Sequence, residues 1–136
     1  MLRDFLMREA RIRFRWGESD CASMCDRWVQ ERAGISPMTA AGYCYRSGIG
    51  AAEVFAAHGD IVEACRTAMR IVGFTPVVRP EPGDIGTIHV RHRGRSLACM
   101  AIYSAMGWVS HLPSGLAVFP IGVRVSGMWR VPCRKP

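Results

Sequence analysis

The spacing of hydrophobic and polar positions changes once along the chain, near residue 75. Before that point apolar residues recur every three or four positions, the spacing of one face of an α-helix. After it, short apolar runs alternate with glycine-containing breaks, which is typical of short antiparallel strands. The pattern predicts a single α+β domain over residues 1–136, with a helical half at 1–74 and a sheet half at 75–133.

Four helices are predicted in the helical half. The best defined begins after Ser19 or Asp20, has apolar residues at positions 21, 24, 25, 28 and 29, and ends at Gly34. Asp60 and Glu63 form a capping-box pattern before another helix that stops at Gly73. The predicted helices cover residues 2–10, 21–33, 51–58 and 61–72, and residues 35–50 are predicted to form an irregular packed loop.

Six short strands are predicted after the turn formed by Pro82, Gly83 and Asp84. They cover residues 85–90, 97–103, 107–111, 116–119, 123–125 and 128–131, and glycine-containing turns separate most of them. We therefore expect a meandering antiparallel sheet or half-barrel, with the helical half packed on one face. Residues 130–136 contain two prolines and no apolar stripe, so we expect a tail without structure of its own.

Charge narrows the possible partners. The chain has 18 basic and 11 acidic residues, a net charge of +7, and arginine at every basic position except Lys135. Nucleic acid, an anionic cell wall and an acidic protein are all compatible with this excess. Nucleic acid is disfavoured because no aromatic residues interleave with the arginines at 91, 93 and 95. No apolar run approaches the ~20 residues that span a bilayer, and no secretory signal is visible, so we expect no membrane segment.

Six cysteines stand at positions 21, 25, 44, 65, 99 and 133. They include no C-x-x-C pair, and without a secretion signal reduced thiols are favoured over disulfides. Cys21 and Cys25 share one face of a predicted helix, and Cys133 could approach them. This is the one feature that points to a metal ion or an iron–sulfur cluster. We expect no cofactor.

Cys21 has the position of a nucleophile. It follows Asp20 at a predicted helix N-terminus, which would stabilise a thiolate and lower the thiol pKa. The segment Trp16-Gly17-x-x-Asp20-Cys21 resembles the one before the catalytic cysteine of NlpC-type peptidases. The turn Pro82-Gly83-Asp84 also resembles the family's turn before its first strand. This resemblance implies a papain-like fold, with N-terminal helices packed on a C-terminal antiparallel sheet.

The resemblance fails at the general base. The family's second strand begins with a catalytic histidine and continues His-x-Gly-Ile-Tyr, whereas here the segment reads Cys99-Met100-Ala101-Ile102-Tyr103. A thiol cannot replace imidazole as a base near neutral pH. His89 and His111, on neighbouring predicted strands, are possible substitutes, although structural roles are expected for both. The pattern therefore argues against an enzyme.

The chain is most similar to small proteins of tailed-phage tail modules that share this degenerate NlpC-like pattern. That resemblance implies a structural protein of the tail tip or baseplate that is made in the host cytoplasm and carried in the virion. The tail-tip hub and the distal tail protein are the expected partners. Trp108, Trp129 and Arg130 are candidate interface anchors, with the core as the alternative place for both tryptophans. The alternative function is an active cysteine peptidase that degrades peptidoglycan peptides during phage entry.

Overall fold

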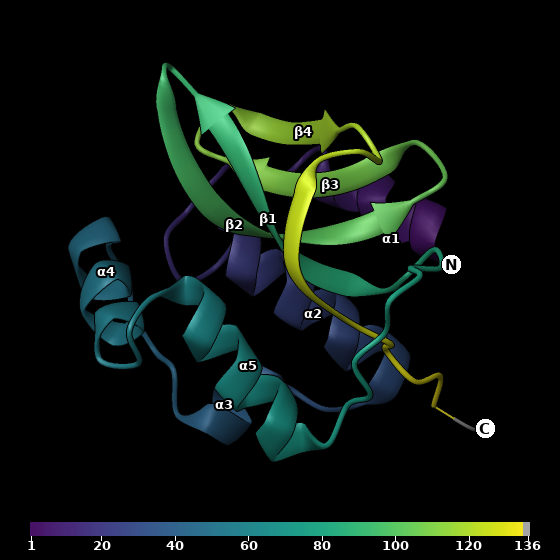
Figure 1. Ribbon diagram of the computed structural model, residues 1–136, viewed down its shortest axis with the longest axis horizontal. Coiled ribbons are helices and arrows are strands. Elements are labelled where there is room, and N and C mark those ends of the chain that lie inside the picture. The colour runs from purple at the N-terminus through teal and green to yellow at the C-terminus, as the bar shows by residue number, and fades with distance from the viewer. Residues whose placement is uncertain (135–136) are drawn as a thin grey trace.

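A computed structural model describes residues 1–134, apart from the side chain of His92. A layer of helices lies against one side of a strongly curved antiparallel sheet (Figure 1). Within the described residues the helices are α1 (Leu2–Glu9), α2 (Cys21–Ala33), α3 (Pro37–Ala41), α4 (Gly48–Ala56) and α5 (Ile61–Val72). The strands are β1 (Ile85–His92), β2 (Arg95–Ser104), β3 (Gly107–Leu112), β4 (Gly115–Phe119) and β5 (Arg124–Trp129). The predicted α+β class is confirmed.

The two longest helices, α2 and α5, begin and end at the capping residues that the sequence suggested. The Asp20 carboxylate accepts hydrogen bonds from the backbone N–H groups of Ala22 and Ser23 at the start of α2. Asp60 accepts one from the N–H of Glu63 at the start of α5. Gly34 and Gly73 follow the last turns in the left-handed conformation, φ 76° in both, which a glycine adopts without strain.

The prediction of an irregular loop over residues 35–50 was wrong in part. The Ser36 side chain accepts a hydrogen bond from the N–H of Thr39, and Pro37 occupies the first turn, so α3 forms. The Ser47 side chain accepts one from the N–H of Gly50, so α4 begins three residues before the predicted helix. Because serine and proline at these positions satisfy or remove free backbone donors, a helix can start inside a glycine-rich segment.

The strands follow the order β4-β3-β2-β1-β5, so a four-stranded meander is joined by β5, which returns to pair with β1. The predicted break at Ser126 and Gly127 was wrong, because β5 runs through both. Ser126 is skipped in the pairing with β1, because Thr87 pairs with Gly127 and Ile88 with Val125, so β5 has a bulge there. The last predicted strand also ends earlier than expected, at Trp129.

Two apolar clusters lie on opposite faces of the sheet. The first fills the space between sheet and helices and includes Phe5, Trp28 and Ile102. The second lies inside the curved sheet and combines Trp108 with side chains from all five strands, among them Ile88 and Val125. Because both faces of the sheet are covered, its strands are apolar on both sides along part of their length.

The C-terminal segment is attached to the helical layer. Val131 is 1% exposed, and its carbonyl accepts a hydrogen bond from Nε of Arg32 at 2.9 Å. The N–H of Arg134 donates to the carbonyl of Arg32 at 2.6 Å. The prediction of an unstructured tail was therefore wrong for residues 130–134, and residues 135–136 lie outside the described part of the chain. Among residues 1–134, no helix has the length and apolar character needed to cross a membrane.

Candidate functional site

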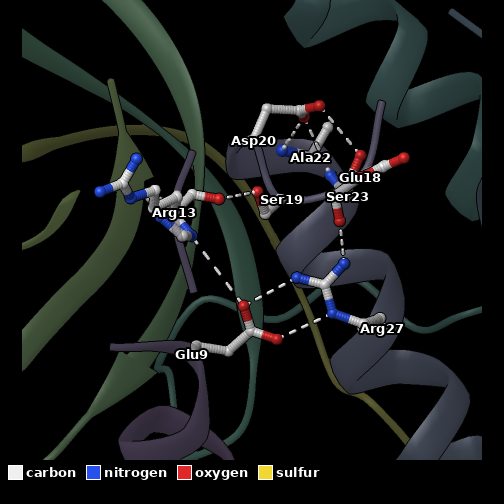
Figure 2. A network of polar contacts seen from close by, with 9 residues as sticks. Glu9, Arg13, Glu18, Ser19, Asp20, Ala22, Ser23 and Arg27 are labelled. Atoms are coloured by element: carbon white, nitrogen blue, oxygen red, sulfur yellow. Dashed lines mark hydrogen bonds and ion pairs between the residues drawn. The ribbon is translucent and has the colours of Figure 1, made fainter. Parts of the chain in front are cut away.

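Cys21 is the first residue of α2, and the segment before it is shaped by the Asp20 carboxylate. Besides capping the helix (Figure 2), this carboxylate accepts hydrogen bonds from the N–H of Gly17 at 2.6 Å and from the hydroxyl of Tyr45 at 2.8 Å. Gly17 has φ +82°, and a Cβ there would lie 1.9 Å from the Tyr45 carbonyl oxygen. The glycine and the aspartate of the Trp-Gly-x-x-Asp-Cys segment therefore both hold Cys21 in place.

A cavity of about 400 Å³ opens beside Cys21, between the segment before α2, helix α4 and strands β2 and β3. Its walls are mainly apolar and include Phe14, Trp16 and Phe55. Cys99 and His111 also line it. The structure thus brings together the nucleophile position, the base position and one of the two candidate substitute histidines. His89, the other, is absent from the described lining of this cavity.

The Cys21 thiol is not activated. Burial, together with the nearby Cys99 and Asp20, raises the pKa of Cys21 to about 12, although hydrogen bonding to the backbone of Met100 and Ala22 lowers it. The lowered pKa expected from the helix N-terminus was therefore wrong. The positive end of a helix stabilises a thiolate by a fraction of a unit charge, whereas apolar surroundings remove the solvation of the full charge.

Cys99, which lines the same cavity, offers no base. Its side chain is buried, and burial raises the pKa of this thiol, while a hydrogen bond with Ser110 lowers it. The Ser110 hydroxyl itself donates to the carbonyl of Met100 at 2.8 Å. Cys99 is therefore a neutral thiol in the cluster inside the curved sheet.

His111 is 0% exposed, and neither ring nitrogen has a hydrogen-bond partner. Nδ1 lies 3.9 Å from Oε2 of Glu9 in α1, and that carboxylate is held by two hydrogen bonds from Arg27, at 2.8 and 2.7 Å. Burial lowers the pKa of His111, Glu9 raises it and Arg27 lowers it. The imidazole is therefore neutral near pH 7.

The Glu9–Arg27 pair, which joins α1 to α2, was not identified as a site element from the sequence. Glu9 is only 2% exposed, and Figure 2 shows its carboxylate facing the Arg27 guanidinium. One signal was available, because Glu9 falls on the apolar face of the first predicted helix, at helical spacing from Leu2, Phe5 and Leu6. A carboxylate at such a position needs a buried partner.

The remaining candidates are placed away from this cavity. His89 on β1 contacts the Ser126 hydroxyl on β5. Trp108 and Trp129 are 1% and 6% exposed and belong to the two apolar clusters, so their prediction as interface anchors was wrong. A buried indole offers no surface to a partner.

Arg130 is half-buried and bonded within the chain. Its Nε donates to Oδ1 of the buried Asp84 at 2.9 Å, and its Nη1 lies 3.5 Å from Oε2 of Glu81. Asp84 also accepts from the N–H of Glu81 at 2.7 Å. The carbonyl of Gly83 accepts from the Trp28 indole at 2.8 Å. The Pro82-Gly83-Asp84 turn and Arg130 thus join the start of the sheet to α2 and to the end of β5.

Cys25 is buried in the helix-facing cluster, and Cys133 is exposed. Within the part of the chain that the structure describes, no group of three or more histidine, cysteine or acidic side chains is arranged to hold a metal ion.

The chain is thus an α+β protein whose cavity contains two thiols and a buried imidazole. It belongs to the family described as domain of unknown function DUF6950, whose pattern matches residues 1–131. Comparison with curated proteins and with solved structures returns no match.

Proposed function

We propose that this protein is a structural component of a phage tail tip or baseplate, built on a papain-like, NlpC-type fold without peptidase activity. One observation carries the proposal: Cys21 at the start of α2 and Cys99 on β2 line the same cavity. In the NlpC-type pattern these two positions would hold the nucleophile and the base. In this proposal the protein retains the fold of a cysteine peptidase but lacks the base that would accept the proton of the nucleophile.

The electrostatics of the cavity support the loss of catalysis. A thiol nucleophile requires a base that takes its proton and later donates it to the leaving amine. Burial raises the pKa values of both Cys21 and Cys99, so both are neutral at pH 7. Two neutral thiols in an apolar cavity supply neither a nucleophile nor a base.

The composition of the whole chain supports a role in an assembly. A net charge of +7 favours association with acidic proteins and accelerates encounter with them. A tail-tip hub and a distal tail protein are the partners that the phage resemblance implies. In this proposal the protein is made in the host cytoplasm and carried in the virion.

An active peptidase that degrades peptidoglycan peptides is the second candidate, and His111 is the observation in its favour. It lines the same cavity as Cys21 and has two unpaired ring nitrogens. Proton transfer is nevertheless strongly uphill, because the pKa of Cys21 is raised to about 12 while burial lowers the pKa of the imidazole. These pKa shifts weigh against the peptidase.

Two measurements test the proposal. Purified virions of the phage that encodes the chain are probed with an antibody against it, and we expect a constant number of copies per particle. Purified protein is incubated with peptidoglycan, with Cys21→Ser as the control, and we expect no release of peptides by either. Absence from virions would overturn the structural role. Turnover by the wild type that disappears in Cys21→Ser would establish the peptidase instead.

A further inference from the structure

The net charge of the protein comes entirely from the sheet and the residues that follow it. Residues 1–84 contain eleven basic and eleven acidic side chains, whereas residues 85–136 contain seven basic side chains and no acidic one. The helical part is therefore neutral overall, and the excess of +7 belongs to the part that begins with β1. The excess positive charge is thus confined to the sheet and the residues after it.

Four of these seven residues lie close together at the end of the β1–β2 hairpin, a group that we name the arginine hairpin: Arg91, Arg93, Arg95 and Arg124. Arg91 and Arg95 belong to β1 and β2 on either side of the turn, and Arg93 lies in the turn with φ 52°. Arg124 of β5 pairs with His89, two residues before Arg91 on β1. The hairpin extends away from the helical layer (Figure 1).

All four side chains are exposed. Among residues 1–134, none of the four takes part in an ion pair, whereas Arg8, Arg15, Arg27, Arg66 and Arg130 all do. Successive strand residues point to opposite faces, and Arg95 pairs across the hairpin with His92, the neighbour of Arg91. Arg91 and Arg95 therefore project from opposite faces, and the hairpin presents positive charge on both sides.

We propose that the arginine hairpin docks into an acidic recess on a neighbouring protein of the particle. This inference rests on the proposed structural role and adds to it the surface and the chemistry of the partner. Guanidinium groups form paired hydrogen bonds with carboxylates, and unpaired exposed arginines keep all of their donors available. A ribbon with charge on both faces fits between two acidic walls better than onto one flat surface.

Nucleic acid fits this surface less well. Residues 85–98 contain no phenylalanine, tyrosine or tryptophan, so the hairpin offers no stacking platform for unpaired bases. A duplex is long and uniformly charged, whereas the excess basic side chains are confined to residues 85–136, and residues 1–84 have as many acidic as basic side chains. A compact acidic patch on a protein matches the limited size of the basic surface.

The test is a charge reversal in the encoding phage. Arg91, Arg95 and Arg124 are each replaced by glutamate, and Arg93 is left unchanged because of its left-handed backbone. The matched control reverses three exposed arginines outside the hairpin, Arg3, Arg11 and Arg46, and so changes the net charge equally. Circular dichroism and thermal melting of both purified variants confirm that they fold.

The readout is the number of copies of the chain in purified particles. We expect the hairpin variant to be incorporated at least about tenfold less than the wild type, and the control variant to be incorporated normally. Equal incorporation of wild type and hairpin variant would overturn the docking surface and leave the structural role intact. Absence of the wild type itself would overturn the structural role.

Binding to a DNA duplex of about 30 base pairs tests whether the arginine hairpin contacts nucleic acid instead of a protein. We expect the hairpin variant and the control variant, which have the same net charge, to bind it equally weakly. If the hairpin variant loses DNA binding and is still incorporated into particles, the hairpin is a nucleic-acid contact and the proposal fails.

Discussion

Residues 1–84 contain every acidic side chain of the protein, and three of them, Glu9, Asp20 and Asp84, are almost completely buried. Residues 85–134 contain no acidic side chain, and Trp108 is packed at 1% exposure inside the curved sheet. Residues 1–84, which are the helical half and the turn before β1, are thus connected by buried carboxylates that accept hydrogen bonds from several segments. The sheet half is held by the strand hydrogen bonds and by an apolar cluster.

This contrast matters because the two kinds of interaction respond differently to change. A substitution that removes either a buried carboxylate or one of its donors leaves the other group unsatisfied. An apolar cluster that loses a side chain leaves a cavity. The cavity with Cys21, Cys99 and His111 lies where the two halves meet. Four experiments separate the contributions of the halves.

The largest effect is expected in the sheet half. Trp108→Ala removes a fully buried indole that packs edge to face on Tyr103, with ring centroids 5.1 Å apart. We expect the free energy of unfolding to fall by about 4 kcal/mol, measured by urea denaturation. Trp16→Ala, at a position 42% exposed in the helical half, is the control and should cost less than about 1 kcal/mol. Equal losses in the two variants would contradict the contrast.

The next effect concerns Asp20 in the helical half. Asp20→Ala leaves five donor groups without their acceptor: the N–H groups of Gly17, Ala22 and Ser23 and the hydroxyls of Ser23 and Tyr45. We expect a loss of about 3 kcal/mol by urea denaturation.

Asp20→Asn is the matched variant for this position. Asparagine keeps the shape of the side chain and one acceptor oxygen, but its N–H₂ group faces a donor. The free energy of unfolding of this variant should therefore lie between those of the wild type and Asp20→Ala. Losses below about 1 kcal/mol in both variants would show that the carboxylate does not connect these segments.

Each half has one exposed thiol and one thiol in the shared cavity, so alkylation compares them directly. With a pKa of about 12, the thiolate fraction of Cys21 at pH 8 is roughly a thousandfold below that of a thiol at its ordinary pKa. The higher nucleophilicity of a more basic thiolate offsets part of this difference.

We therefore expect iodoacetamide to modify the exposed Cys44 and Cys133 at least about 30-fold faster than Cys21, with Cys99 also protected by burial. Peptide mass spectrometry over time measures the four rates. Preferential modification of Cys21 in the native protein would show an activated nucleophile and favour the peptidase function.

The smallest effect is the pH dependence from His111, which lies between the halves. Because burial lowers its pKa in the folded protein, the unfolded chain binds the additional proton more readily. Stability should be complete above pH 6.5 and should fall as the pH drops toward the folded pKa, by no more than about 1.4 kcal/mol per pH unit for one group.

The measurement compares the free energy of unfolding of wild type and His111→Gln between pH 7.5 and 5. The glutamine variant should lose part of the acid dependence, although Glu9, Arg27 and Asp20 still face that position. Identical slopes for the two proteins would show that His111 is not the titrating group.

The ends of the elements could be predicted because they depend on neighbouring residues in the sequence. Asp20, Asp60, Gly34 and Gly73 act within one turn of their helices, and all four have the predicted roles. The beginning of α4 at Gly48 was missed, because glycine there suggested a loop and the Ser47 cap was not recognised. The continuous β5 was missed because its register, in which Ser126 is skipped, depends on pairing with β1, a strand about forty residues earlier.

The sequence by itself determined the order of a helical half followed by a sheet half, the position of Cys21 at a helix N-terminus and the absence of histidine at position 99. Only the tertiary structure decided what these residues can do. The pKa of Cys21 depends on the surroundings contributed by β2 and α4, and the charged groups nearest His111, Glu9 and Arg27, come from α1 and α2. Solvation and charge–charge energies depend on distance in space, and residues far apart in the chain set those distances only when it folds.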